Sequence, residues 1–389
     1  MVTEERFDVV QDPGAVSRPA DPMVRSMTDP STGPRLRRAL QGIPSYKPGR
    51  PAAAATDRPT YKLSSNENPF PPLPALVEAA HEASRVMNRY PDLACGRLVG
   101  ALSDRLDVPP GHFATGTGSV ALLYHLLQAT CEPGDEVVYA WRSFEAYPIA
   151  AQVAGATRIE VPLTTGARHD LPAMAAAITE RTRVVIVCTP NNPTGPVVTH
   201  QELADFCAQV PRDVLIVVDE AYLQFVRDPA AADGLALYRE YPNVCVLRTF
   251  SKAYCLANFR VGYAIAHDPV AEALRVCTPP FAVSSVAEEA ALAALACENE
   301  LLEQVEVLVK ERTRVAEGLR ALGFDVPATE ANFSWLPLGA DTQAFARACE
   351  EGGVVVRPFG DEGCRVSVGE PAANDLFLEL AGRWAARTA

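Results

Sequence analysis

Leu215-Ile216-Val217-Val218-Asp219-Glu220-Ala221-Tyr222 is the stretch that decides the fold. Its first four residues are apolar and mostly β-branched, which is typical of a parallel strand buried on both faces, and an acidic residue stands where the strand ends. A similar run, Val184-Val185-Ile186-Val187-Cys188, leads into Thr189-Pro190-Asn191-Asn192-Pro193-Thr194-Gly195, and a third strand-like run ends in Arg248-Thr249-Phe250-Ser251-Lys252. Ligands of open α/β sheets bind at the carboxyl ends of the strands. We therefore expect Asn192, Asp219 and Lys252 to face one crevice.

The same alternation extends on both sides of this stretch. Seven short apolar runs, separated by longer amphipathic stretches, lie near residues 113–116, 136–140, 157–161, 183–188, 214–218, 244–249 and 261–266. This pattern is typical of a mainly parallel sheet covered by helices. The sequence therefore predicts an α/β fold with a seven-stranded sheet between helices.

The 389-residue chain divides into four predicted segments. Residues 1–35 mix charged residues with Pro, Ser and Thr and show no periodicity, so we expect a flexible N-terminal tail. Residues 36–66 are expected to join a small domain, and residues 67–282 to form the large domain. Residues 283–389 begin with a long Ala-, Leu- and Glu-rich helical stretch to about Gly323, which predicts a linking helix followed by an α+β small domain.

Composition and charge exclude several classes of protein. A formal net charge of −13 argues against a nucleic acid or an anionic membrane as partner. No stretch reaches the length of a membrane span, and the acidic start has no apolar segment of the secretory type. The ten cysteines include no Cys-x-x-Cys pair, so neither a metal site nor a disulfide scaffold is indicated. We expect a cytoplasmic metabolic enzyme without a metal.

Lys252 has the neighbours that a covalently reactive lysine needs. A lysine amine becomes a good nucleophile when burial and nearby cations lower its pKa. The hydroxyls of Thr249 and Ser251 and the guanidinium of Arg260 suit a phosphate group beside it. Gly116-Thr117-Gly118-Ser119 precedes a helical run from Val120 to Ala129, and amides at a helix start also bind phosphate.

The plainer interpretation of each motif is a surface lysine, a helix cap at Asp219, or an ordinary turn. The order and spacing of the three strand ends argue against three separate coincidences. Pyridoxal phosphate chemistry requires a lysine of this kind, and a buried Asp that faces the pyridine nitrogen keeps the ring protonated.

From about residue 36 to residue 389 the chain resembles the fold-type I pyridoxal phosphate aminotransferases. The motifs that carry the resemblance are Asn191-Asn192-Pro193-Thr194-Gly195, Asp219-Glu220-Ala221-Tyr222 and the stretch from Ser251-Lys252 to Arg260-Val261-Gly262-Tyr263. Lys62–Pro69, Arg89–Asp92 and Ala331–Phe333 resemble its histidinol-phosphate aminotransferase branch. Trp141–Pro148 and Gly118–Val120 are more similar to the aromatic, or phenylalanine, aminotransferase subgroup.

The resemblance implies pyridoxal 5'-phosphate as cofactor and a set of residues that bind it. These are Ser119, Val120, Phe144, Asn192, Asp219, Tyr222, Thr249, Ser251, Lys252 and Arg260, with Tyr90 reaching the cofactor of the neighbouring subunit. Lys252, Asp219 and Tyr222 form the implied catalytic set, in which Lys252 is both tether and base. The role of Tyr90 implies a homodimer.

The resemblance also implies a substrate site made of Tyr46, Asn192, Arg357 and Arg365. Arg365 matches the arginine that pairs with the substrate's α-carboxylate, whereas Arg357 and Tyr46 match positions that hold phosphate in histidinol-phosphate enzymes. For Arg357, an exposed arginine at a strand end is an open alternative. The expected reaction is ping-pong transfer of an amino group from a phenylalanine-like amino acid to a 2-oxo acid such as 2-oxoglutarate.

Several alternatives stay open. Histidinol phosphate is a second candidate substrate, and an unusual amino acid of specialised metabolism is a third, because Cys255 and Asn258-Phe259 replace residues that are commonly glycine in the family. Asn258 is expected to accept the left-handed conformation there and to add bulk near the phosphate or the substrate. The same scaffold also serves decarboxylases, lyases and oxidases. A regulator with an aminotransferase-like domain is disfavoured, since the 35-residue tail is too short and too weakly basic to bind DNA.

Overall fold

The computed structural model describes residue 34, residues 36–43 and residues 59–388. The chain forms two compact units, Met1–Gly42 and Ile43–Ala389. The described part of the first contains a single 3-10 turn, η1 (Arg38–Leu40). Apart from residue 34, the predicted tail lies outside the described residues, and so does Tyr46.

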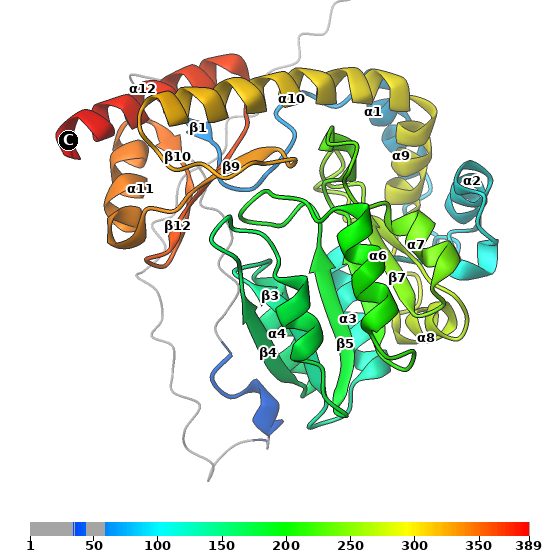
Figure 1. Ribbon diagram of the computed structural model, residues 1–389. Coiled ribbons are helices and arrows are strands. Elements are labelled where there is room, and N and C mark those ends of the chain that lie inside the picture. Colours follow the sequence, from blue (N-terminus) through cyan, green and yellow to red (C-terminus); the bar gives the residue numbers. More distant parts are fainter. Residues whose placement is uncertain (1–33, 35, 44–58, 389) are drawn as a thin grey trace, which may run out of the picture. The chain divides into compact units, whose positions relative to one another are not determined.

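The second unit is built around a seven-stranded sheet (Figure 1). Its strands are β2 (Phe113–Gly116), β3 (Glu136–Trp141), β4 (Thr157–Pro162), β5 (Thr182–Cys188), β6 (Leu215–Asp219), β7 (Val244–Thr249) and β8 (Gly262–Ile265). The order is β2-β8-β7-β6-β5-β3-β4. Strand β8 runs antiparallel to β2 and β7, and the other neighbours are parallel. The predicted sheet is confirmed, and each predicted run agrees with its strand within one residue at either end.

Both faces of the central strands β5, β6 and β7 are buried, which explains their unbroken apolar runs. Along β6, Ile216 and Val218 face one core cluster while Leu215 and Val217 face the other. Side chains of a strand alternate between faces, so a strand covered on both sides needs apolar residues at every position. In β5, β6 and β7 the polar side chains are consequently confined to the strand ends, whereas the edge strand β4 is largely exposed and carries Arg158 and Glu160.

Helices cover each face. The face of Leu215 and Val217 packs against α3 (Ser119–Thr130), α4 (Ala146–Ala154) and α8 (Val270–Cys277). The other packs against α1 (Pro74–Ser84), α2 (Gly96–Leu106), α5 (Leu171–Ala176), α6 (His200–Gln209), α7 (Gly234–Glu240) and α9 (Ser285–Ala296). Short 3-10 turns are η2 (Pro110–His112) and η3 (Leu223–Phe225).

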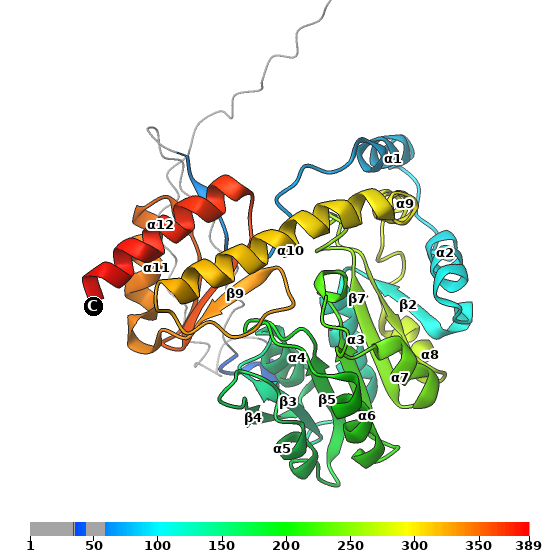
Figure 2. The ribbon, with the colours of Figure 1, turned by 45° about the horizontal axis from the view of Figure 1, so that its top comes forward.

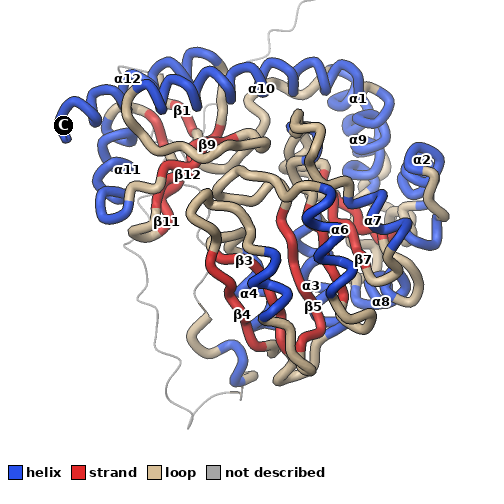
Figure 3. Tube along the Cα trace, viewed as in Figure 1, coloured by secondary structure: helices blue, strands red, loops and turns tan. Residues whose placement is uncertain are grey.

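A second group of strands lies apart from the large sheet (Figure 3). It has a hydrophobic core of its own. Strand β1 (Tyr61–Lys62) pairs with β10 (Val354–Val355), and β9 (Phe333–Leu336), β11 (Arg357–Phe359) and β12 (Gly363–Ser367) form an antiparallel sheet in the order β11-β12-β9. Turn η4 (Gly339–Asp341) and helices α11 (Thr342–Glu351) and α12 (Pro371–Thr388) accompany them. The boundaries predicted at residues 66/67 and 282/283 stay a prediction.

The predicted linking helix is two helices. Helix α9 ends at Ala296, and α10 (Glu298–Ala321) continues beyond Cys297 and lies beside α12 (Figure 2). Among the described residues, no helix is both long and apolar enough to cross a membrane.

Gly262 places β8 against the start of α3. A Cβ atom added there would lie 2.6 Å from the backbone N of Ser119 and 2.9 Å from the carbonyl oxygen of Arg248. Both neighbours are backbone atoms of packed elements, so they cannot move aside cheaply. This close approach fixes the distance between the strand and the amides at the start of α3.

We therefore expect Gly262→Ala to lower the free energy of unfolding by about 1–3 kcal/mol, the usual cost of overpacking a core. Gly111→Ala is the matched control, because an added Cβ would meet no described atom within 4 Å. Urea unfolding of the two variants measures the difference. Equal stabilities would contradict the close approach.

Candidate active site

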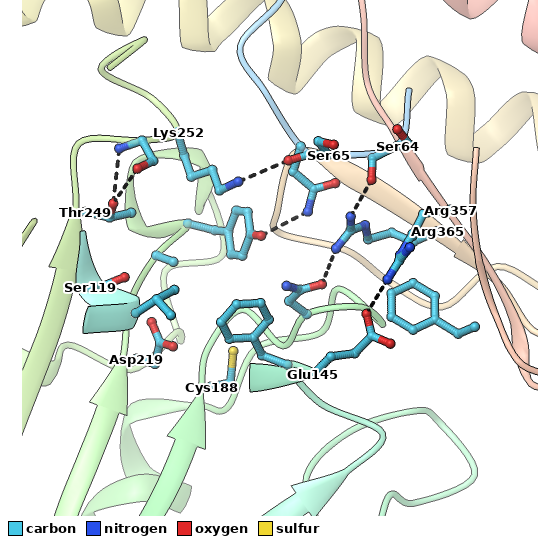
Figure 4. A pocket seen from close by; sticks show the side chains of 18 of the residues that line it. Ser64, Ser65, Ser119, Glu145, Cys188, Asp219, Thr249, Lys252, Arg357 and Arg365 are labelled. Atoms are coloured by element: carbon cyan, nitrogen blue, oxygen red, sulfur yellow. Dashed lines mark hydrogen bonds and ion pairs between the residues drawn. The ribbon is translucent and has the colours of Figure 1, made fainter. Parts of the chain in front are cut away.

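A pocket of about 230 Å³ lies at the carboxyl ends of β5, β6 and β7 (Figure 4). The three strand-end residues that were expected to face one crevice all line it. The predicted site residues in its lining are Ser119, Val120, Phe144, Asn192, Asp219, Tyr222, Thr249, Ser251, Lys252, Arg260, Arg357 and Arg365. Ser64, Ser65, Asn66, Glu145, Cys188, Ala221 and Phe359 line it as well, without having been predicted as site residues.

Lys252 follows β7 and points into the pocket, where its Nζ donates a hydrogen bond of 3.2 Å to the carbonyl oxygen of Ser65. Burial is the main cause that lowers the pKa of Lys252 to about 7, and the positive charges of Arg365 and Arg260 lower it further. An amine with this pKa is about half neutral near pH 7 and mostly neutral about one pH unit higher. Lys252 therefore has the protonation behaviour that a nucleophile or a base needs near physiological pH.

Asp219 ends β6 and has one satisfied and one unsatisfied carboxylate oxygen. Its Oδ2 accepts a hydrogen bond of 2.8 Å from the hydroxyl of the fully buried Tyr147. Its Oδ1 is buried and has no hydrogen-bond partner among the described residues. Burial raises the pKa of Asp219 to about 6. A bound group with a hydrogen-bond donor would satisfy this oxygen, and such a contact is favourable because leaving a buried acceptor unpaired is costly.

Hydroxyls, helix amides and an arginine gather at the start of α3. The residue before the helix, Gly118, has a φ of 84°, and a Cβ there would lie 2.6 Å from Nη2 of Arg260. The absence of a side chain lets the guanidinium approach the helix start. Arg260 donates to the hydroxyl of Ser251 at 3.2 Å, and the hydroxyl of Thr249 is 3.0 Å from that of Ser251. This cluster has the donors that a phosphate dianion takes.

Asn66 fixes the hydroxyl of Tyr222 from outside the large sheet. Its Nδ2 donates to Tyr222 Oη at 2.9 Å, so the tyrosine's own proton is available to another acceptor. Asn66 is held in turn by Ser367, whose hydroxyl donates to Asn66 Oδ1 at 2.8 Å, and by Asn332, whose Nδ2 donates to the Asn66 carbonyl at 3.2 Å. The Lys62–Pro69 motif was the sequence signal for this residue, but the motif alone gives it no role.

Two arginines enter from β11 and β12. Arg365 is buried and donates to Asn192 Oδ1 at 2.6 Å and to the carbonyl oxygen of Ser64 at 2.8 Å. Arg357 forms an ion pair of 2.7 Å with Glu145, and its side chain is only 11% exposed. The alternative of an exposed strand-end arginine at position 357 is therefore wrong.

Tyr90 lies elsewhere. It is 82% exposed and stacks on Phe281 with 4.6 Å between ring centroids. Tyr90 is described by the structure and does not line the pocket of its own chain. Its predicted reach into a neighbouring subunit stays a prediction.

The loop after Lys252 differs from its expected conformation. Cys255 and Arg260 have positive φ angles of 60° and 55°. Asn258 is also described, but it is exposed and has no positive φ. Neither Cys255 nor Asn258, both described, lines the pocket, and the expected bulk near the phosphate or the substrate stays a prediction.

The residues present fit pyridoxal 5'-phosphate. The orphaned Oδ1 of Asp219 suits a protonated pyridine nitrogen, Phe144 offers a ring for stacking, and the cluster at the start of α3 suits the phosphate. Lys252 suits the aldehyde carbon. Among the described residues, no group of His, Cys, Asp and Glu could hold a metal ion.

Comparison with known proteins adds independent findings. The family model for aminotransferase class I and II matches residues 58–379. An aromatic amino acid aminotransferase of Streptomyces avermitilis is 61% identical over 353 residues, which are 91% of this chain and 98% of the relative. One from Thermobifida fusca is 57% identical and covers 90% of this chain and 96% of its own length.

A similar solved structure is a histidinol-phosphate aminotransferase from Sinorhizobium meliloti in complex with pyridoxal 5'-phosphate. It has a TM-score of 0.82 at 26% identity, and the match covers 92% of this chain and all of that one.

The lowered pKa of Lys252 predicts its reactivity in the cofactor-free protein. Because the neutral amine is the nucleophile, acetylation of Lys252 by acetic anhydride should rise with pH with a midpoint near 7, rather than near the usual lysine value of 10.5. Peptide mass spectrometry over a pH series measures the midpoint. Arg365→Gln should move the midpoint upward, and a wild-type midpoint near 10.5 would contradict the prediction.

Proposed function

The chain belongs to the class I and II aminotransferase family, and from this membership we propose that it transfers the amino group of an aromatic L-amino acid to a 2-oxo acid. It is a pyridoxal 5'-phosphate-dependent aminotransferase. The observation that carries the aromatic substrate is the 61% identity, over nearly the full length of both chains, to an aromatic amino acid aminotransferase.

The walls of the pocket support this substrate. The rings of Phe144, Tyr222 and Phe359 line it together. Aromatic rings of this kind pack well against a flat apolar side chain. A phenylalanine-like side chain would therefore be buried against groups of its own character.

Histidinol phosphate is the second candidate, favoured by the presence of Arg357 in the lining. The ion pair of this arginine with Glu145, at 2.7 Å, weakens that support, because a phosphate would first have to replace the carboxylate on Arg357. An unusual amino acid has weaker support, since the residues that suggested it, Cys255 and Asn258, do not touch the pocket described here.

The proposed mechanism assigns one task to each group. Bound pyridoxal phosphate supplies an electron-withdrawing ring that stabilises negative charge at the substrate's α-carbon. Lys252 would hold the cofactor in the resting enzyme and, once the substrate's amine has taken its place, would accept the α-proton on Nζ as a neutral amine. Asp219 would keep a proton on the pyridine nitrogen through Oδ1, and Tyr222 and Asn192 would bind the cofactor's phenolic oxygen.

Arg365 is proposed to pair with the substrate's α-carboxylate through its two-pronged guanidinium. Ser119, Val120, Thr249, Ser251 and Arg260 are proposed to hold the phosphate. Donor and acceptor then occupy the same site in turn, which gives ping-pong kinetics.

A homodimer is proposed on the basis of one exposed surface. Val77, Val86, Met87, Tyr90 and Leu93 are large apolar residues exposed within a short stretch, and Phe281 beside Tyr90 is exposed too. Clusters of exposed apolar residues mark interaction surfaces. A second copy of this chain would cover them and bring Tyr90 to the neighbouring cofactor phosphate. A cytoplasmic location stays a prediction.

The donor is tested by a single turnover without acceptor. Phenylalanine or tyrosine should yield about one equivalent of 2-oxo acid per site, and added 2-oxoglutarate should restore continuous turnover, as ping-pong transfer requires. Liquid chromatography measures the oxo acid, and Lys252→Ala is the inactive control. Conversion of histidinol phosphate alone would support the second candidate, whereas turnover without an acceptor would indicate a decarboxylase, lyase or oxidase.

The role of Tyr90 is tested by mixing two variants. If Tyr90 serves the neighbouring site, Tyr90→Phe and Lys252→Ala homodimers are each impaired, but a mixed dimer has one complete site. Random re-association should then restore about a quarter of wild-type activity. Analytical ultracentrifugation confirms the dimers, and a mixture no more active than its components would exclude a shared site.

A further inference from the structure

Glu145 and Arg357 form an ion pair inside the pocket. Glu145 immediately precedes α4, and Arg357 lies on β11, so the pair joins the two groups of strands. Arg357 Nη2 and Glu145 Oε2 are 2.7 Å apart, and their side chains are 11% and 29% exposed. In Figure 4 the pair lies on the opposite side of the pocket from Ser119 and Thr249.

This pair differs from the other charged groups of the lining. Lys252, Arg260 and Arg365 donate to neutral acceptors, namely Ser65, Ser251 and Asn192. Among the described residues, two carboxylates line the pocket, and the second, Asp219, accepts from Tyr147. In the pair of Arg357 and Glu145, a carboxylate of the lining directly balances the charge of an arginine of the lining.

The two substrates of the proposed function place opposite demands on this corner. An aromatic amino acid ends in an uncharged ring, against which an unpaired arginine would be poorly solvated. A dicarboxylic 2-oxo acid ends in a second carboxylate, which needs a cation. A site that binds both substrates in turn must expose a positive charge to the dicarboxylic acid and must neutralise that charge when the aromatic amino acid is bound.

We propose that Glu145 and Arg357 form an exchangeable ion pair that sets this dual specificity, an inference that rests on the proposed function. The pair stays closed over an aromatic side chain. When a dicarboxylic acid binds, its distal carboxylate replaces Glu145 on Arg357, and Glu145 turns to the solvent that already reaches it. Glu145 thereby allows the same site to accept an uncharged ring in one half-reaction and a distal carboxylate in the other.

Neighbouring contacts hold both elements in place while the pair opens. Arg142 and Glu362 form a second ion pair between the loop after β3 and the β11–β12 hairpin. The guanidinium of Arg357 also lies 5.4 Å from the ring centroid of Phe359, within the range of a cation–π contact. Opening the Glu145–Arg357 pair therefore leaves the loop after β3 in contact with the β11–β12 hairpin. The Arg142–Glu362 pair lies outside the pocket lining described here, so it provides a matched control.

Glu145→Gln tests the proposal in the cofactor-loaded enzyme, because glutamine keeps the size and an acceptor but removes the charge. Glutarate, an unreactive dicarboxylate, should bind about tenfold more tightly than to wild type, the effect of one charge-assisted hydrogen bond. The ratio of kcat/KM for 2-oxoglutarate to that for phenylpyruvate should rise by about the same factor. Calorimetry measures the first quantity and steady-state kinetics the second.

Arg357→Gln should have the opposite effect on both quantities, and Glu362→Gln should leave both within about twofold of wild type. Unchanged glutarate affinity and an unchanged acceptor ratio in Glu145→Gln would overturn the proposal. Equal changes of glutarate affinity and acceptor ratio in Glu362→Gln would also overturn it, because loss of any nearby negative charge would then have the same effect. Glutarate binding needs no turnover, so it tests the ion pair independently of the reaction. Failure of the wild-type enzyme to use aromatic donors would instead overturn the proposed function.

Discussion

The burial of β5, β6 and β7 on both faces is the constraint on which the site depends. Apolar side chains occupy both sides of these strands, so polar groups are available only where the strands end. Parallel strands end at the same edge of the sheet, so Asn192, Asp219 and Lys252 lie at one pocket. The sheet brings them together, and the fold does not depend on contacts between these three side chains. The low dielectric of the same core acts on the chemistry, because burial is the main cause that raises the pKa of Asp219 and lowers that of Lys252.

The pocket is completed from a part of the chain with a separate core. Ser64, Ser65 and Asn66 follow β1 and contact Arg365, Lys252 and Tyr222 in turn. These contacts join groups proposed to bind substrate with groups proposed to bind cofactor. Residues 64–66 thus form hydrogen bonds both to the proposed substrate-binding group and to the proposed cofactor-binding groups. The geometry of the site therefore depends on both groups of strands.

The sequence predicts the large sheet well because every strand in it is a local apolar run. It predicts Lys252, Asp219 and Asn192 because strand ends can be located from those runs. Glu145 and Arg357 are 212 residues apart, and their pairing depends on how β11 packs beside the loop after β3, which no local pattern encodes. The break at Cys297 was missed for a similar reason, since the flanking Ala-, Leu- and Glu-rich residues favour helix on both sides. Tyr90 depends on a second chain, so neither a single sequence nor a single chain determines its role.

The unsatisfied Oδ1 of Asp219 has a consequence for the lifetime of the protein. A buried carboxylate oxygen without a donor destabilises the cofactor-free chain, and a ligand that satisfies it stabilises the folded state by mass action. Folding and cofactor capture are thus thermodynamically coupled. In a cell short of vitamin B6, newly made chains would spend more time partly unfolded and meet proteases more often. The abundance of the enzyme would then follow the supply of the vitamin through protein turnover, without any change in gene expression.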